Sequence, residues 1–467
     1  MLFGRNGVIQ MSAQVKKYEM DMCSGGVLKK LLLFALPLML SSILQLLFNA
    51  ADVVVVGKFA GDNSLAAVGS NTALINLLTN LFLGLSVGAN VAAARFFGAK
   101  SEDDLSRTVH TSMALSMVSG LILMVLGLIG ARFMLVWMQT PAEVLDLAAV
   151  YLRIYFAGMI PNMVYNFGSA LLRAIGDTKR PLYYLLGAGV INVVLNLFFV
   201  IVLKMDVAGV ALATVISQTI SAVLVLRCLM KESGGIRFSF RRLSLDKRIL
   251  GIILKIGLPA GIQGVIFSLS NVVIQSSINI FGSVVVAGNS AAGNIEGFVY
   301  MAMNAFHQAT ISFVSQNYGA GLHKRISRII LSALGCVIVV GLLLGNLAVF
   351  FGEPLLYIYS NNPEVVAAGM VRLMMICCPY ALCGIMDVMV GALRGIGYSI
   401  IPTIVSLVGV CGLRLLWLAT VFQIPEYHVI ETVYISYTVT WSITIIANVI
   451  CFFCVRKRAY RKVGCAV

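Results

Sequence analysis

The chain has 467 residues, of which 60% are hydrophobic and only 11% are charged, and its net charge is +15. Its mean hydropathy is +0.95, whereas a water-soluble domain is typically about half apolar and a quarter charged. This composition excludes an ordinary water-soluble protein and indicates an integral membrane protein that crosses the bilayer many times.

Twelve apolar segments are long enough to cross a bilayer, which takes about 20 residues of helix. The alternating pattern of a membrane β-barrel is absent, so we predict an all-α integral membrane fold with twelve transmembrane helices. The predicted spans are residues 31–56, 65–94, 109–131, 147–172, 182–203, 207–226, 250–281, 285–316, 329–351, 367–392, 401–422 and 430–454.

The basic residues are distributed unevenly between the two predicted faces of the membrane. Of the 34 Lys and Arg, 28 fall on the side of the termini, three fall on the opposite side and three lie within spans. Positive charge is enriched on the cytoplasmic side, which predicts that both termini are cytoplasmic. Topology thus explains the basicity without a nucleic-acid partner. Arg153 and Arg372 begin two spans from the outer side, where snorkelling to headgroups would accommodate them.

The first span contains one carboxylate, Asp52, in the stretch FNAADVVVVG at residues 48–57. A charge at mid-membrane costs about 2.5–3.5 kcal/mol on insertion scales, so such a residue faces protein or water and is a candidate functional group. Burial favours the neutral form of a carboxyl, whereas a bound cation holds it ionised, so Asp52 could carry either H⁺ or Na⁺. The alternative is a helix-end residue at the outer interface, five residues before Gly57.

An internal repeat divides the chain into two halves. LLRAIGDTKRP at 171–181 is similar to ALRGIGYSIIP at 392–402, at an offset of 221 residues. Six helices is an even number, so both copies begin in the cytoplasm and form a parallel repeat of two six-helix lobes. Two such lobes would enclose a cleft that opens to either side by rocking. Further pairs at this spacing are RFFGAK (95–100) with QNYGAG (316–321), and, at 222, Pro37 with Pro259.

The repeat gives a predicted domain plan of an arm, two lobes, a linker and a tail. We expect a cytoplasmic N-terminal arm at 1–27, an N-lobe at 28–230, a basic cytoplasmic linker at 231–248, a C-lobe at 249–454 and a basic cytoplasmic tail at 455–467.

The Pro37…Asp52…Gly57 pattern, FGAK after the second span, LLRAIGDTKRP after the fourth and the duplicated twelve-helix plan resemble the MATE (multidrug and toxic compound extrusion) family. The resemblance implies a cation-coupled exporter with an N-lobe cation site made of Asp52, Asn192, Asn196 and Thr214. Some family members carry Asp at the position of Asn196. One carboxylate instead of two weakens the case for Na⁺, so we favour H⁺. Interhelical hydrogen bonding by the asparagines is the structural alternative.

A second polar set is predicted in the C-lobe. Glu296, His307 and Gln308 lie along the eighth span, and Asp387 lies in the tenth, 221 residues after Asn166. These residues could form a second ion site, or Glu296 could pair with a basic residue, for which Arg414 is a candidate. His307 is expected to be a hydrogen-bonded packing residue rather than a proton relay.

The sequence patterns give little support to an enzymatic function. GLSVG at 84–88 matches a nucleophile-elbow pattern but lies inside a span, where small residues favour close helix packing. The sequence has no phosphate-binding loop, no metal-ligand cluster and no dinucleotide-binding glycines, so no catalytic residue, metal or cofactor is expected. CFFC at 451–454 has no second cysteine pair.

The sequence predicts a multi-pass monomer in a bacterial plasma membrane, and the family resemblance implies that it exports amphipathic, often cationic, drug-like compounds. The alternatives are a lipid or lipid-linked oligosaccharide flippase and a structural or intramembrane enzyme role. The few basic residues within the spans disfavour the flippase.

Overall fold

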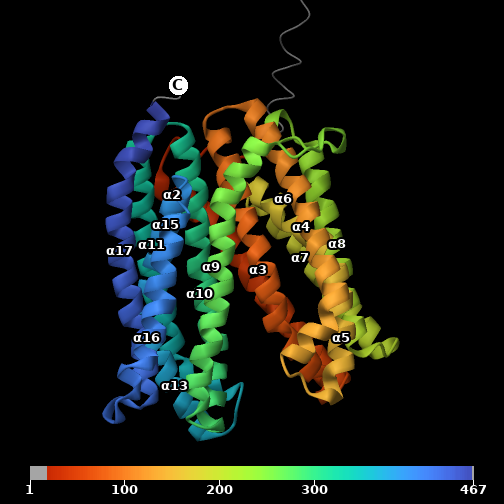
Figure 1. Cartoon of the computed structure of the whole chain (residues 1–467). Helices are drawn as coiled ribbons and strands as arrows, with labels where there is room; N and C mark the ends of the chain where they lie inside the picture. Colours follow the sequence, from red (N-terminus) through yellow and green to blue (C-terminus); the bar gives the residue numbers. More distant parts are fainter. Residues whose placement is uncertain (1–17, 465–467) are drawn as a thin grey trace, which may run out of the picture. The chain divides into compact units, whose positions relative to one another are not determined.

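The computed structural model describes residues 18–464, which form helices and no strand (Figure 1). The first half contains α2 (Val27–Phe59), α3 (Asp62–Gly98), α4 (Glu102–Trp137), α5 (Ala142–Ala157), α6 (Met159–Ala174), α7 (Lys179–Leu197) with the π-helical η1 (Phe198–Val202), and α8 (Asp206–Lys231). The second half contains α9 (Lys247–Asn279), α10 (Ser283–Gly319), α11 (His323–Phe350), α12 (Gly352–Tyr357), α13 (Pro363–Cys377), α14 (Ala381–Gly395), α15 (Ile400–Ser406), the π-helical η4 (Leu407–Gly412), α16 (Leu413–Ala419) and α17 (Ile430–Gly464).

Each of the twelve predicted spans corresponds to helical structure. Within residues 18–464, nine helices are long and apolar enough to cross a membrane, and two bent helix pairs bring this number to eleven. The twelfth is α10, which has 37 residues but carries many polar side chains, including Asn289, Glu296 and His307. The twelve-helix prediction is confirmed in this sense.

Two of the spans are bent rather than straight. α5 and α6 meet at 48° at Gly158, and α13 and α14 meet at 45°. In both cases a proline lies at the break: Pro161 is in the first turn of α6, and Pro379 lies just before α14. Proline lacks the N–H that would continue the helical hydrogen bonds and clashes with the preceding turn, so each span breaks there.

The repeat is visible in the backbone. α3 and α10 both have 37 residues, and each follows a glycine with positive φ, Gly61 at 88° and Gly282 at 89°. Gly176 and Gly397 follow the ends of α6 and α14 and also have positive φ, 95° and 90°. Both pairs are 221 residues apart, the offset predicted from the sequence. Only glycine adopts this conformation without steric cost.

By packing, the chain divides into two compact units. One contains residues 44–261 with the described part of the arm up to Ser24, and the other contains residues 25–43 and 262 onward. α2 and α9 therefore each contribute to both units, whereas the repeat predicts lobes at 28–230 and 249–454, which remain a prediction. The arm residues 1–17 and the last tail residues, 465–467, lie outside the described residues.

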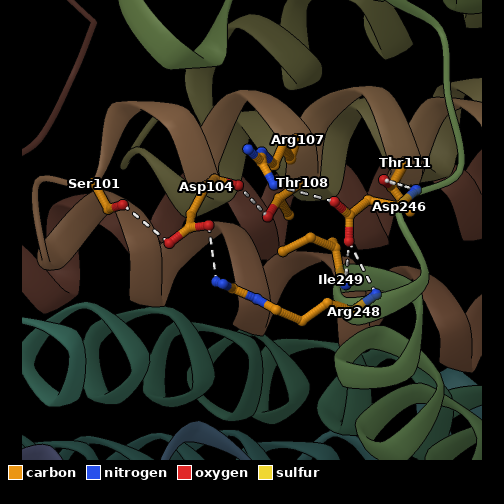
Figure 2. Close-up of polar contacts among 8 residues, drawn as sticks. All are labelled: Ser101, Asp104, Arg107, Thr108, Thr111, Asp246, Arg248 and Ile249. Atoms are coloured by element: carbon orange, nitrogen blue, oxygen red, sulfur yellow. Dashed lines mark hydrogen bonds and ion pairs between the residues drawn. The ribbon is translucent and has the colours of Figure 1, made fainter. Parts of the chain in front are cut away.

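The basic linker between α8 and α9 packs on the start of α4. Asp246 forms an ion pair with Arg107 at 3.5 Å, and Arg248 pairs with Asp104 at 2.8 Å. The backbone N–H of Asp246 donates to the hydroxyl of Thr111 at 3.1 Å. Figure 2 shows these contacts of α4 with Asp246, which directly precedes α9, and with the first turn of α9. They fix where the linker enters the first turn of α9.

Candidate functional site

Four polar residues predicted from the sequence form one hydrogen-bonded network in the first unit. Asp52 lies on α2, Asn192 and Asn196 lie on α7, and Thr214 lies on α8. Asn192 and Asn196 are separated by one helical turn, so both side chains project from the same face of α7. Both are buried, with exposed fractions of 4% and 0%. Three helices thus bring their polar groups to a single carboxylate.

Both oxygens of the Asp52 carboxylate have a polar neighbour, but the single proton of the Thr214 hydroxyl also has the Val210 carbonyl oxygen within reach, at 3.0 Å. The Asn196 amide donates to Oδ1, and the Thr214 hydroxyl lies 3.4 Å from Oδ2. The same Asn196 amide nitrogen lies 3.3 Å from Asn192 Oδ1, and Asn192 Nδ2 lies 3.4 Å from the Thr214 hydroxyl. Asn196 Oδ1 has no hydrogen-bond partner among the described residues. The donor that Asn196 presents to Oδ1 suits an ionised Asp52.

A cavity of about 130 Å³ adjoins this network. Asp52, Asn192 and Thr214 line it together with Asn162 and Asn166 of α6. The Asn166 amide donates to Asn162 Oδ1 at 2.7 Å, so this amide pair is internally bonded. The cavity gives Asp52 polar neighbours on one side within an otherwise apolar helix bundle.

In the second unit, the partner of Glu296 is Arg372, not Arg414. Arg372 donates to Glu296 Oε2 through Nη2 at 2.6 Å and through Nε at 3.1 Å. The Tyr380 hydroxyl donates to Glu296 Oε1 at 3.0 Å. The side chains of Glu296 and Arg372 are only 13% and 12% exposed. The expectation that Arg372 snorkels to headgroups is therefore wrong, because its guanidinium is held inside the bundle by Glu296.

His307 contacts the main chain of Asp387 and not its carboxylate. His307 Nδ1 lies 2.5 Å from the main-chain oxygen of Asp387, which agrees with a hydrogen-bonded packing role for this histidine. Tyr300 lies near the Asp387 carboxylate, and both line the same cavity. Asp387 and Glu296 line one cavity of about 490 Å³, whereas His307 is not among its lining residues. The Gln308 amide donates to Asn304 at 3.0 Å on α10.

The sequence reasoning did not find all residues of the second set. Glu296 is bonded by Arg372 and by the Tyr380 hydroxyl. Arg372 in turn donates to Asn289, with Nη1 2.5 Å from Oδ1. The available signal was the charge of Arg372 inside an apolar segment, since an intramembrane charge is usually paired. In the GLSVG stretch, Ser86 donates to the Leu83 carbonyl at 2.7 Å, and its glycines pack closely on α9, as expected for helix packing.

Comparison with known proteins identifies the family. The MatE family model matches residues 37–198 and 259–419, one match in each half of the chain. A probable multidrug resistance protein of Bacillus subtilis (strain 168), YpnP, is 30% identical over 403 residues, covering 84% of this chain and 88% of that protein. Another from the same organism, YoeA, is 27% identical over 429 residues, covering 90% and 92%.

Solved structures agree with the fold. A structure described as the outward-facing conformation of a multidrug resistance MATE family transporter of the MOP superfamily has a TM-score of 0.86. It is 23% identical, and the match covers 94% of this chain and 98% of that one. The family matches in both halves, the relatives along nearly the whole length and the twelve-helix fold lead to one conclusion: the chain belongs to the MATE family of membrane transporters.

Proposed function

We propose that this protein is a secondary active multidrug exporter that moves amphipathic, often cationic, organic compounds out of the cell in exchange for H⁺. The family membership and the relatives named as multidrug resistance proteins support export of small organic molecules. The predicted setting is a bacterial plasma membrane with both termini in the cytoplasm.

The observation that carries the coupling proposal is the environment of Asp52. It is a single carboxylate, partly buried, bonded only to neutral amide and hydroxyl groups, and it borders a cavity. A group that takes up a proton from one side of a membrane and releases it to the other needs a polar pocket of this kind inside an apolar bundle.

Asn196 gives the network a way to accommodate both protonation states of Asp52. An amide side chain carries a donor and an acceptor on one planar group. With its NH₂ toward Asp52, as in this structure, it donates to an ionised carboxylate. After a half-turn about its terminal bond, its oxygen would accept a hydrogen bond from a protonated carboxyl. The otherwise unpartnered Asn196 Oδ1 would then gain a donor.

The ligand set favours H⁺ over Na⁺. A hard cation is bound by several oxygen ligands and gains affinity from negative charge. Here one carboxylate is surrounded by neutral groups, and the nearest of them, the Asn196 amide, presents a donor to it. A proton needs only the carboxylate itself. The Glu296 carboxylate is already neutralised by Arg372, so it adds no free charge for a second cation.

Transport in proteoliposomes tests the proposal. With an imposed pH gradient and no Na⁺, the wild-type protein should drive uptake or efflux of a cationic dye, and Asp52→Asn should abolish it. Asp146→Asn is a matched control, because Asp146 is an exposed carboxylate, 80% accessible, that pairs with Arg132 at 3.1 Å. Transport that appears only with a Na⁺ gradient would overturn the proton coupling. Wild-type transport by Asp52→Asn would remove Asp52 from the mechanism.

A further inference from the structure

The second unit contains a cavity that is larger and chemically different from the one beside Asp52. Its volume is about 490 Å³, within the range of drug-sized ligand pockets. α9, α10, α13, α14, α16 and α17 contribute its walls. Several of these helices are direct neighbours within this unit (Figure 1). The cavity belongs entirely to this unit.

The walls of the cavity are rich in aromatic rings. Tyr380 lies 5.6 Å from Trp441, and Trp441 lies 5.7 Å from Tyr437, measured between ring centroids. Tyr300 and Phe267 also line the space. Rings at these separations interact favourably and present flat surfaces on which another aromatic group can stack.

Two of the four charged residues that line the cavity neutralise one another. Glu296 receives three hydrogen bonds, two from Arg372 and one from Tyr380. Arg372 also donates to Asn289 and lies 5.8 Å from the ring of Tyr434. This pair is thus saturated by the protein itself and offers little to a ligand.

Arg414, the third charged residue, has no carboxylate partner. Its side chain faces the cavity and is buried, with only 3% exposure. None of the ion pairs among residues 18–464 involves it. Nη2 donates to the Thr440 hydroxyl at 3.1 Å, and the guanidinium lies 3.8 Å from the ring of Tyr437. Its Nε has no hydrogen-bond partner in the described part of the chain.

A buried guanidinium without a carboxylate partner is a suitable binding group for an anion. An unpaired buried charge is costly, and a bound carboxylate would satisfy it with charge-assisted hydrogen bonds. Asp387, the fourth charged residue, forms none of the ion pairs found among residues 18–464, with Arg414 or with any other residue. Asp387 is therefore not a carboxylate partner of Arg414, although both residues line the cavity.

We propose that this cavity is a second ligand site, distinct from the Asp52 network, and that it binds an aromatic organic anion whose carboxylate pairs with Arg414. The ring system of the ligand would lie among Tyr300, Tyr380 and Trp441. This site extends the range of ligands beyond the cationic compounds of the proposed export function, and it does not depend on that function.

Equilibrium dialysis of the purified full-length protein in detergent tests the site without any transport step. Three probes share one ring system: naphthoate, which is ionised at neutral pH, the neutral naphthamide, and the cation naphthylmethylammonium. Naphthoate is expected to bind most tightly, with one molecule per chain. Acetate is expected to bind at least about ten-fold more weakly than naphthoate, because it lacks the rings that would stack on the aromatic walls.

Arg414→Gln should weaken naphthoate binding by about ten- to a hundred-fold, the value of a charge-assisted hydrogen bond, and change naphthamide binding less than about two-fold. Arg153→Gln is the matched control, an exposed arginine of the first unit, and should leave both unchanged. Arg414→Lys keeps the charge without the planar guanidinium and is the second variant, used in case Arg414→Gln does not fold. Its naphthoate affinity should lie between that of the wild type and the value expected for Arg414→Gln.

Three results would overturn the proposal. The first is tighter binding of naphthylmethylammonium than of naphthoate, which would make the cavity a cation site. The second is naphthoate affinity that is unchanged in both Arg414 variants. The third is no naphthoate binding, or binding no tighter than that of acetate.

Discussion

Position 196 decides how much negative charge the Asp52 network holds, so it provides a direct test of ion preference. In Asn196→Asp, two carboxylates would face each other where one amide now donates to Asp52. Like charges at this separation repel unless a proton or a cation lies between them. We expect Na⁺ to raise the melting temperature of Asn196→Asp by roughly 3 °C or more at saturating concentration, and to leave the wild type unchanged.

The measurement is thermal unfolding in detergent, in sodium against choline chloride at equal ionic strength. Asn346→Asp is the matched control, because Asn346 is an exposed residue of α11 whose amide donates to the Leu342 carbonyl at 2.7 Å. Na⁺ stabilisation of the wild-type protein to the same extent would contradict the preference for H⁺.

Glu296 and Arg372 should depend on each other for stability. Removing one partner of a buried ion pair leaves an uncompensated charge and typically costs about 3–5 kcal/mol. Glu296→Gln and Arg372→Gln should therefore each destabilise strongly, and the double variant should lose less than the sum of the two. A double-mutant cycle of unfolding free energies measures this coupling. Purely additive losses would show that the pair contributes little as a pair.

The sequence predicted the Asp52 network more fully than the second polar set. Asp52, Asn192, Asn196 and Thr214 came from the family resemblance, and the structure brings them together, although their role in coupling remains a prediction. The pairing of Glu296 with Arg372 joins two residues 76 positions apart on different helices. No sequence spacing indicates such a contact, and both Arg372 and Arg414 are charges within predicted spans, so the sequence alone does not distinguish them as partners.

At the level of helices, close packing of α3 on α9 depends on glycine. A Cβ at Gly84 would lie 2.2 Å from the backbone nitrogen of Gly261, and one at Gly88 would lie 2.3 Å from the Ile253 carbonyl oxygen. Small residues allow such close backbone approach in membranes. We expect Gly84→Ala to lower the free energy of unfolding by about 1–3 kcal/mol through overpacking.

Gly69 supplies the control on the same helix. A Cβ at Gly69 meets no atom within 4 Å, so Gly69→Ala should be neutral or stabilise α3 by up to about 1 kcal/mol. Chemical unfolding of both variants in detergent compares them. Equal effects of the two substitutions would contradict the packing argument.

Asp246 directly precedes α9 and makes the stability of the fold depend on pH. Its carboxylate accepts hydrogen bonds from the backbone N–H groups of Ile249 at 3.1 Å and Arg248 at 2.9 Å, and it pairs with Arg107 (Figure 2). The backbone hydrogen bond from Ile249, followed by the bond from Arg248 and the charge of Arg107, lowers the pKa of Asp246. Asp246 therefore stabilises the folded state above its unfolded pKa, and this contribution is lost as the pH falls through its folded pKa.

Thermal unfolding of Asp246→Ala and of the wild type across the acid range measures this effect. The wild type should be more stable at neutral pH, and the difference should shrink as the pH drops below about 4, near the pKa of an unfolded Asp. Asp246→Asn keeps a capping side chain and should fall between them. A difference that stays constant with pH would exclude a role for the charge.

Helix positions were easier to predict than helix shapes. Long apolar runs locate spans because every backbone polar group in the bilayer core must be bonded within a helix. The bends of 48° and 45° were not predicted, although Pro161 and Pro379 mark them. The sharing of α2 and α9 between the two packing units is set by contacts among distant residues, and hydropathy carries no information about them.

For the whole molecule, the prediction to test is the membrane topology, that is, which side of the membrane each loop faces. Of the 34 Lys and Arg, 28 lie on the side predicted to be cytoplasmic and three on the other, and this asymmetry sets orientation. Lys58 ends α2, and Lys324 lies in the first turn of α11. Seven predicted spans, from residues 65–94 to residues 285–316, separate Lys58 from Lys324. Seven is an odd number of membrane crossings. The two positions should therefore face opposite sides of the membrane.

Cysteine accessibility measures this in intact cells. Lys58→Cys should react with a membrane-impermeant maleimide added outside, and Lys324→Cys should react only after the membrane is permeabilised. The protein's own cysteines, several of them buried, require the unsubstituted protein as the blank. The repeat makes the result informative beyond orientation, because two six-helix halves can have the same orientation only if each half crosses the membrane an even number of times. Labelling of both positions from the same side would break the twelve-span topology and the parallel repeat together.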